Sequence, residues 1–191
     1  MNASSGSALC PTRIGTVDHV TLHVVRKVQL SESIQDYLKS IYKLQAETGR
    51  VTIGALAHDK AVSAASASAM VKKLTALELL AHERYHGAYL TPAGERVALE
   101  VIRHHRLLEL YLAETLGLHV DDVHDEADRL EHVISEELEA RIDRALGFPT
   151  HDPHGDPIPD ANLEWPAAPA ARPRKRTGGG GLGAAAQRPK K

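Results

Sequence analysis

Histidine and carboxylate side chains recur at helical spacing in two parts of the chain. One predicted helix carries four of them at relative positions 0, 4, 7 and 8: His124, Asp128, Glu131 and His132. At about 100° per residue these positions fall within a sector of about 100°, so the four side chains share one stripe. Upstream, His105 and Glu109 stand four residues apart, which lets an imidazole and a carboxylate bind the same ion. These residues predict metal binding, and the alternative is a solvated face with simple ion pairs.

Composition narrows the class of protein. The 191 residues contain 12 histidines, more than Trp, Tyr and Phe combined, and this enrichment also favours metal chemistry. A formal net charge of -2 is unusual for a protein that stays on nucleic acid, so any DNA binding must come from a local patch or a switch. The only cysteine, Cys10, has no partner for a disulfide or a thiolate site, and no apolar run approaches 18 residues. We therefore expect a cytoplasmic protein with no membrane segment and no export signal.

Helical periodicity and capping residues predict the elements that must position the two clusters. A first helix begins at a cap on Ser31 or Ser33 and ends at Gly49, a short helix covers 51–58, and a third helix covers about 63–79. Residues 80–90 predict a hairpin that leads into the next helix. A short helix, a turn and a longer helix followed by a hairpin are typical of a winged helix-turn-helix.

Two amphipathic helices are predicted after the hairpin, one from Pro92 to a stop at Gly117 and one from about Val120 to Leu146. Beyond Pro149 the chain is rich in Pro, Gly and Ala, and its last twenty residues hold seven Lys or Arg and no acid. Such a tail is predicted to be disordered. The sequence has no HExxH, GxSxG, phosphate-binding glycine loop or paired-Cys motif, so we expect neither catalysis nor a small-molecule substrate.

Several separate segments resemble one known family, in the right order. They are VHDEADRLEHV at 123–133, RHHRLLE at 103–109, LTPAG at 90–94, DYLKSIY at 36–42 and HGDPIP at 154–159. From about residue 31 to 159 the chain closely resembles the diphtheria toxin repressor and manganese transport regulator family of metal-dependent transcriptional regulators. The resemblance implies a mainly α fold: an N-terminal extension (1–30), a winged helix-turn-helix DNA-binding domain (31–96), a helical metal-binding and dimerisation domain (97–159) and a disordered basic tail (160–191), with no C-terminal β-barrel domain.

The resemblance also implies two metal sites. The primary site carries over to Asp36, Asp128, Glu131 and His132, and the ancillary site to His105, Glu109 and His124. Iron sensors of the family have Met and Cys where this chain has Asp36 and Asp128, whereas manganese sensors have carboxylates at both positions. A set of three carboxylates and one imidazole suits Mn(II) first and Fe(II) next, while Zn(II), Co(II) or Cd(II) would bind in vitro.

Two departures from the family pattern bear on the number of ions. Manganese sensors with a paired-ion site have Glu one turn after the first-helix Asp, but this chain has Lys39 there, whose charge would repel a second cation. Two separate sites are therefore expected rather than a binuclear cluster. Iron sensors complete the ancillary site from the β-barrel domain, so here that site is open, filled by water or structural only. The remaining histidines, including His154, are assigned no metal role.

Family correspondence places the start of the third helix at DNA, through Ser63, Ala65, Ser66 and Ser68. Small side chains permit close approach to the groove, and hydroxyls can bond phosphates or base edges. The candidate phosphate contacts are Lys72, Lys73, Arg84 and His86. Helix propensity and tight packing are the alternative explanation of this Ala/Ser run.

The resulting hypothesis is a repressor that controls metal-ion homeostasis genes. One ion joins Asp36 on the DNA-binding domain to the dimerisation side, and a homodimer presents two recognition helices to double-stranded operator DNA. Because His132 must be neutral to bind metal, the response should weaken in mild acid. The alternatives are a winged-helix regulator that answers an organic ligand or nothing, with the His/acid stripe only structural, and an enzyme or a metal store.

Overall fold

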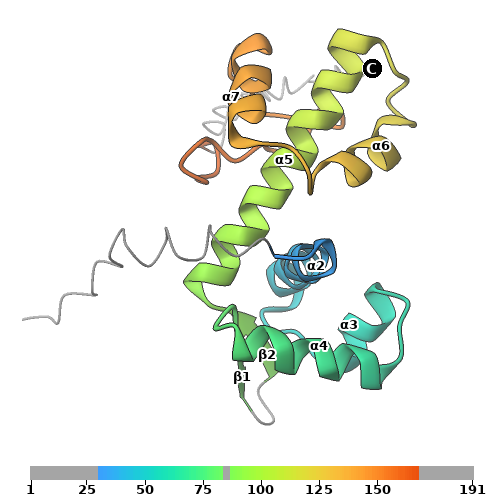
Figure 1. Ribbon diagram of the computed structural model, residues 1–191, viewed down its shortest axis with the longest axis vertical. Helices are drawn as coiled ribbons and strands as arrows, with labels where there is room; N and C mark the ends of the chain where they lie inside the picture. Colours follow the sequence, from blue (N-terminus) through green and yellow to red (C-terminus); the bar gives the residue numbers. More distant parts are fainter. Residues whose placement is uncertain (1–29, 84–86, 168–191) are drawn as a thin grey trace, which may run out of the picture.

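Six helices and a two-stranded sheet make up the part of the chain that the computed structural model describes, which is residues 30–83 and 87–167. In chain order they are α2 (Glu32–Thr48), α3 (Ile53–Asp59), α4 (Ala64–Ala76), β1 (Leu80–Glu83), β2 (Gly87–Leu90), α5 (Pro92–Leu116), α6 (Val123–Leu130) and α7 (Glu136–Ala145). Figure 1 shows two halves joined by α5. The winged-helix half holds α2, α3, α4 and the sheet, and the second half holds α6, α7 and the segment after them. The predicted mainly α fold is confirmed.

Local capping explains where the elements of the winged-helix half begin and end. Ser31 precedes α2 in an extended conformation, and Gly49 ends the helix with a left-handed φ of 74°. The side chain of Thr52 caps α3, and that of Ser63 caps α4. The core beneath these helices contains Leu38, Ile41, Leu56 and Leu74, all fully buried. The strands β1 and β2 are antiparallel, with Leu80 opposite Leu90, and form the predicted hairpin.

Helix α5 belongs to both halves. Thr91 caps its first turn by accepting a hydrogen bond from Gly94 N, Pro92 occupies the first turn, and Gly117 ends the helix in the left-handed conformation. Ala98, near its start, lies in the hydrophobic core of the winged-helix half. Leu107, near its end, lies in the separate core of the second half. A side chain on α5 can therefore face either half.

The predicted single helix from Val120 to Leu146 is wrong, because the chain forms two helices there. Helix α6 ends at Leu130, and α7 begins after Ser135, whose side chain accepts a hydrogen bond from Leu138 N. Acidic side chains in the first turn of α7 favour its N-terminal dipole and reinforce this second start. As a result Glu131 and His132 lie just beyond the end of α6 rather than in the middle of a long helix.

The segment after α7 folds back along α5. Ile158 is buried in the second core, and Trp165 Nε1 donates a hydrogen bond of 3.0 Å to the Tyr42 hydroxyl. Residues 160–167, which the sequence assigned to the tail, are thus part of the described fold. The predictions for residues 1–29, for Arg84 and His86, and for residues 168–191 lie outside the described residues. None of the described helices is long and apolar enough to cross a membrane.

Candidate metal centre

The three residues of the predicted ancillary site converge between α5 and α6. His105 Nε2 lies 3.0 Å from Glu109 Oε1, one turn along α5. His124 Nδ1, on α6, lies 2.9 Å from the same carboxylate oxygen. The two imidazole rings meet edge to face, with centroids 4.7 Å apart. One ligand atom from each residue lies within 4.8 Å of the others, so the three can share an ion.

Electrostatics in this cluster keep the carboxylate ionised. Burial by itself would raise the pKa of Glu109, but hydrogen bonds with His105 and His124 lower that pKa to about 2. Burial likewise opposes the cationic form of His105, yet its hydrogen bonds with Glu109 and Glu131 raise its pKa above the ordinary value. Glu109 therefore holds the charge state that a metal ligand requires, whereas His105 would have to release a proton to bind one.

A second cluster joins α2 to the turn after α6. His132 Nε2 lies 3.2 Å from Asp36 Oδ1 and 3.5 Å from Glu131 Oε1. These three residues also offer ligand atoms within 4.8 Å of one another. The other ring nitrogen of His132 donates to Gln35 Oε1 at 2.7 Å, so in the neutral ring Nε2 would carry the lone pair that binds a metal. Sequence reasoning missed Gln35, because its role depends on how α2 meets the turn.

Lys39 separates Asp128, the fourth predicted primary ligand, from this cluster. Its Nζ donates to Asp128 Oδ1 at 3.1 Å and to the two Glu131 oxygens at 2.9 and 2.7 Å. The same Nζ lies 3.2 Å from His105 Nδ1. Asp128 consequently groups with His105 and Glu131 rather than with Asp36. Burial would raise the pKa of Asp128, but the Lys39 ammonium lowers it.

The segment after α7 brings two further potential ligands to Glu109. His154 Nδ1 lies 3.9 Å from Glu109 Oε2, and Asp152 completes a fourth group that could hold an ion. The backbone N–H groups of His154 and Asp156 both donate to Asp152 Oδ1 at 2.9 Å, which fixes this turn. No metal role was predicted for His154 from the sequence. The short spacing of Asp152 and His154 was a visible signal, but the sequence does not show that this turn returns to α5.

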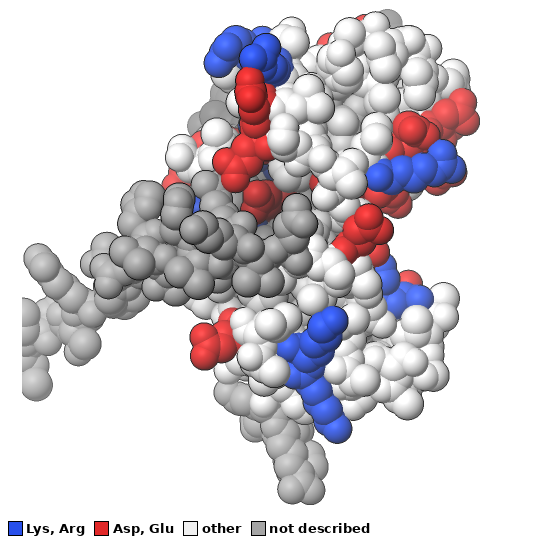
Figure 2. Space-filling model, in the orientation of Figure 1, with Lys and Arg blue, Asp and Glu red and all other residues white. Residues whose placement is uncertain are grey.

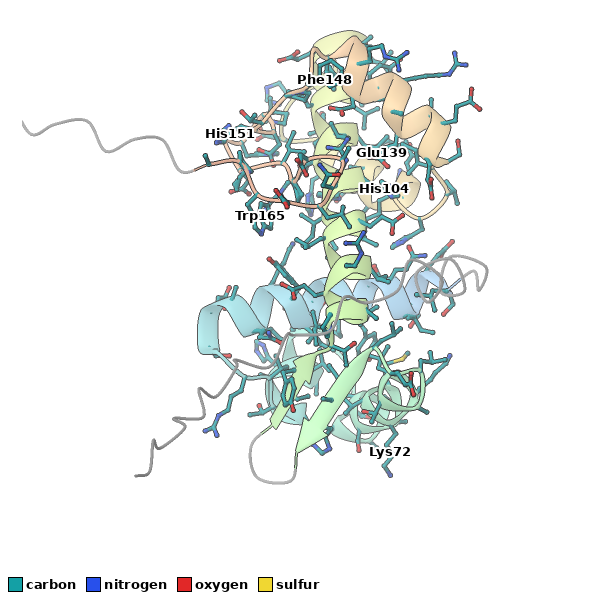
Figure 3. The ribbon with its side chains drawn as sticks, turned by 90° about the vertical axis from the view of Figure 1, so that its left-hand side faces the viewer. Lys72, His104, Glu139, Phe148, His151 and Trp165 are labelled. Carbon is teal, nitrogen blue, oxygen red and sulfur yellow. The ribbon has the colours of Figure 1, made fainter. Side chains whose placement is uncertain are left out.

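The predicted DNA-contacting residues on α4 lie at its outer face. Ser63, Ala65, Ser66, Lys72 and Lys73 are exposed and Ser68 is partly so, while Ala67, Val71 and Leu74 form the buried face. Figure 3 shows Lys72 pointing away from the body, at the end of the molecule opposite α7. In Figure 2 acidic side chains gather mainly over the second half, whereas Lys and Arg are exposed with few acids at the winged-helix end. On α4 itself, Lys72 and Lys73 with no acid in the helix supply the positive charge that phosphate contacts need.

Two family models match consecutive parts of the chain. Residues 29–88 match the N-terminal DNA-binding domain of iron-dependent repressors, and residues 91–160 match their metal-binding and dimerisation domain. Together these matches cover both halves of the described structure.

Individual relatives match about two thirds of the chain. The chain is 34% identical over 130 residues to the diphtheria toxin repressor of Corynebacterium diphtheriae, covering 68% of this chain and 58% of the relative. A solved manganese-dependent transcriptional repressor in complex with manganese is 47% identical, with a TM-score of 0.65 over 71% of this chain and 63% of the other. The structure of ScaR with bound Zn2+ is 37% identical, with a TM-score of 0.62 over 69% of this chain and 61% of the other. The chain therefore spans less than two thirds of the length of these relatives.

Proposed function

The chain belongs to the family of iron-dependent repressors, and we propose that it is a transcriptional repressor whose binding to operator DNA is switched on by a divalent metal ion. One observation carries this proposal: Asp36 on the winged-helix half and Glu131 and His132 on the second half present ligand atoms to one point. A divalent ion bound there would supply a positive cross-link between the two halves. These side chains thereby tie metal binding to the placement of the DNA-binding elements.

The donor chemistry supports Mn(II), with Fe(II) next. The cluster offers carboxylates from Asp36 and Glu131 and an imidazole from His132. Asp128, the fourth ligand that we propose, would add a carboxylate once Lys39 leaves it, and none of the four residues is a thiolate or thioether. Such hard oxygen-rich sets suit Mn(II) and Fe(II), while Zn(II), Co(II) and Cd(II) would bind in vitro because intrinsic affinity follows a different order. The manganese-bound relative and the zinc-bound ScaR are consistent with both parts of this expectation.

A second ion would be held by His105, Glu109 and His124. Glu109 is their common partner, and its second oxygen lies near His154, so the turn after α7 would supply additional ligands from within this chain. This contact supports the proposal that His154 and Asp152 close the ancillary site.

DNA binding would be performed by α4 in a homodimer. The exposed Ser63–Ser66 start of α4 and its two lysines suit a helix that enters the major groove, and the dimerisation domain would set the spacing of two such helices. Reciprocity requires operator DNA to tighten metal binding by the factor by which metal tightens DNA binding. Such a regulator would work in the cytoplasm, beside the operators of metal-homeostasis genes.

Metal titration in the presence of operator DNA tests this function. Chelator-treated protein is titrated with Mn(II) and Fe(II), and DNA affinity is measured for the natural protein, Asp36→Ala and the control Glu47→Ala, which removes an exposed acid from the same helix. We expect metal to raise the DNA affinity of the natural protein roughly 5- to 150-fold. The increase should be far smaller in Asp36→Ala and should equal that of the natural protein in Glu47→Ala. DNA affinity that ignores metal would instead favour the regulator of organic ligands, and turnover of a substrate would favour an enzyme.

A further inference from the structure

We propose that Lys39 is a built-in competitor for the primary metal site, so that its ammonium must leave the carboxylates before a divalent cation can be bound by the full ligand set. This inference rests on the proposed metal-dependent function and adds what sets the metal concentration at which DNA binding is switched on. From the sequence, Lys39 was expected only to repel a second cation.

The Lys39 ammonium occupies the position where the ligands of the two predicted sites face each other. Three carboxylate oxygens, one from Asp128 and two from Glu131, lie between 2.7 and 3.1 Å from its Nζ, and the His105 Nδ1 lies at 3.2 Å. Glu131 is 1% exposed and Lys39 8% exposed, so water does not screen the contacts between these two residues. A monovalent cation thus takes the donor atoms that a divalent cation requires.

The ammonium and a divalent metal ion oppose each other on Glu131 in this geometry, because both would hold positive charge against the same carboxylate. Hard divalent ions bind carboxylate oxygens at about 2.0–2.6 Å, and here both oxygens of Glu131 already accept hydrogen bonds from Lys39. An ion on Glu131 would therefore lie within a few ångströms of a fixed positive charge, with little water between them. Release of Lys39 also frees Asp128 to turn toward the other primary ligands.

The structure offers the displaced side chain a place to go. Lys39 borders a cavity of about 380 Å³ whose walls include Glu109, Asp152 and Asp156. Arg106 also lines this cavity and already lies 3.8 Å from Asp152 and 3.7 Å from Asp156. Because the Asp156 side chain is 65% exposed, the displaced ammonium would be hydrated beside it rather than buried unpaired.

Competition of this kind lowers apparent metal affinity. The apparent dissociation constant rises in inverse proportion to the fraction of molecules in which Lys39 has left the site. Because Lys39 lies on α2, its bonds to Asp128 and Glu131 already connect the two halves before a metal arrives. The ion replaces an existing connection, and metal below the threshold leaves the ammonium in place.

Mn(II) binding to chelator-treated full-length protein tests the competition directly. Lys39→Met removes the ammonium. The control Lys43→Met removes a charge one turn further along α2 that acts on Asp128 and Glu131 through space, with no hydrogen bond to either among the described residues. We expect Lys39→Met to bind Mn(II) at least about tenfold more tightly than the natural protein, and Lys43→Met to stay within about threefold. Affinity in Lys39→Met that is equal or weaker would overturn the competition while leaving the proposed function intact. Absence of Mn(II) binding in the natural protein and in both variants would overturn the proposed function as well.

A measurement on the natural protein covers the case in which Lys39→Met fails to fold. Lysine amines are labelled with a reactive anhydride, with and without saturating Mn(II), and the modification of each lysine is read by mass spectrometry. Lys39 should become several-fold more reactive when Mn(II) is added, while exposed Lys72 on α4 should not change. Unchanged or reduced labelling of Lys39 would show that its ammonium stays on the carboxylates and would overturn the proposal.

Discussion

At the scale of single residues, the site is defined by which partner each acid faces. Glu131 faces Lys39 and His105, Glu109 faces His105 and His124, and Asp36 faces His132. Residue types and spacing indicated Glu131, and Glu109 with its neighbour His105, whereas Asp36 followed from the family resemblance. The contacts of Lys39 and Gln35 were not predictable, because these side chains reach the ligands only through the approach of α2 to the turn after α6.

The turn after α7 makes a residue-scale prediction about the second ion. His154→Ala should weaken binding of that ion by roughly tenfold, because it removes the imidazole that faces the second oxygen of Glu109. Mn(II) titrations followed by electron paramagnetic resonance can resolve the two binding steps. His151→Ala is the matched control, since His151 lies in the same turn with Thr150 as its partner. An equal effect of both variants on the second step would count against the role of His154.

A buried ion pair predicts how stability depends on pH. Glu139 accepts hydrogen bonds from His104 at 3.0 Å and from Arg103 at 2.5 Å, and Figure 3 shows Glu139 and His104 facing each other between α7 and α5. Burial raises the pKa of Glu139, but hydrogen bonds with His104 and Arg103 outweigh it and lower the pKa. Burial lowers the pKa of His104, but Glu139 raises it on balance. The carboxylate therefore contributes stability that is lost as the pH falls below about 4, and the imidazolium contributes stability that is lost as the pH rises through the raised pKa of His104.

Near pH 6, the free energy of unfolding of Glu139→Gln should be about 2 kcal/mol lower than that of the natural protein. This difference should shrink below about pH 4 and diminish in part above neutral pH, where His104 is uncharged. Urea denaturation of metal-free protein at three pH values measures it. Glu137→Gln, which breaks an exposed pair with Arg141 on the same helix, should change stability by less than about 0.5 kcal/mol. A difference that does not vary with pH would contradict the ion-pair explanation.

At the scale of elements, boundaries with a chemical signal were predictable and one break was missed. Gly49, Thr91-Pro92 and Gly117 delimit α2 and α5 as the sequence indicated. The break between α6 and α7 was missed because apolar residues continue across it at helical spacing. Ser135 followed by two glutamates is the signal of a new helix start, and in the structure Ser135 caps the beginning of α7.

The junction of α5 with the sheet predicts a severe effect of one methyl group. A Cβ added to Gly94 would lie 2.0 Å from the carbonyl oxygen of Leu79, a backbone atom that cannot turn aside. Gly94→Ala should therefore lower the free energy of unfolding by about 3 kcal/mol or more. Gly54→Ala on α3, where the nearest atom is a side-chain oxygen at 4.0 Å, should be neutral or slightly stabilising. Thermal unfolding of both variants measures the contrast. Equal stability of Gly94→Ala and Gly54→Ala would show that α5 can move away from Leu79 at little cost.

At the scale of the whole molecule, three connections hold the halves together: the continuous helix α5, the ligand cluster between α2 and α6, and the segment after α7. The third connection depends on Trp165, which bonds the Tyr42 hydroxyl and stacks 5.5 Å from the Arg106 guanidinium. Figure 3 shows Trp165 on this returning segment, beside the middle of the molecule. Tyr42 lies on α2, the helix that carries Asp36 and Lys39, so Trp165 restrains the helix that must meet the ion.

Trp165→Ala should therefore weaken Mn(II) binding without removing any ligand. Loss of the aromatic contact and its hydrogen bond leaves α2 freer in the metal-free protein, and the ion must then order it. The contact is worth about 0.5–1.5 kcal/mol, which corresponds to roughly a 2- to 13-fold increase in the Mn(II) dissociation constant. Trp165→Phe keeps a ring but loses the N–H donor, so its Mn(II) affinity should lie between those of the natural protein and Trp165→Ala. Hydrogen exchange along α2 should quicken in parallel, and faster exchange with unchanged Mn(II) affinity would show that the restraint on α2 and the metal site are independent.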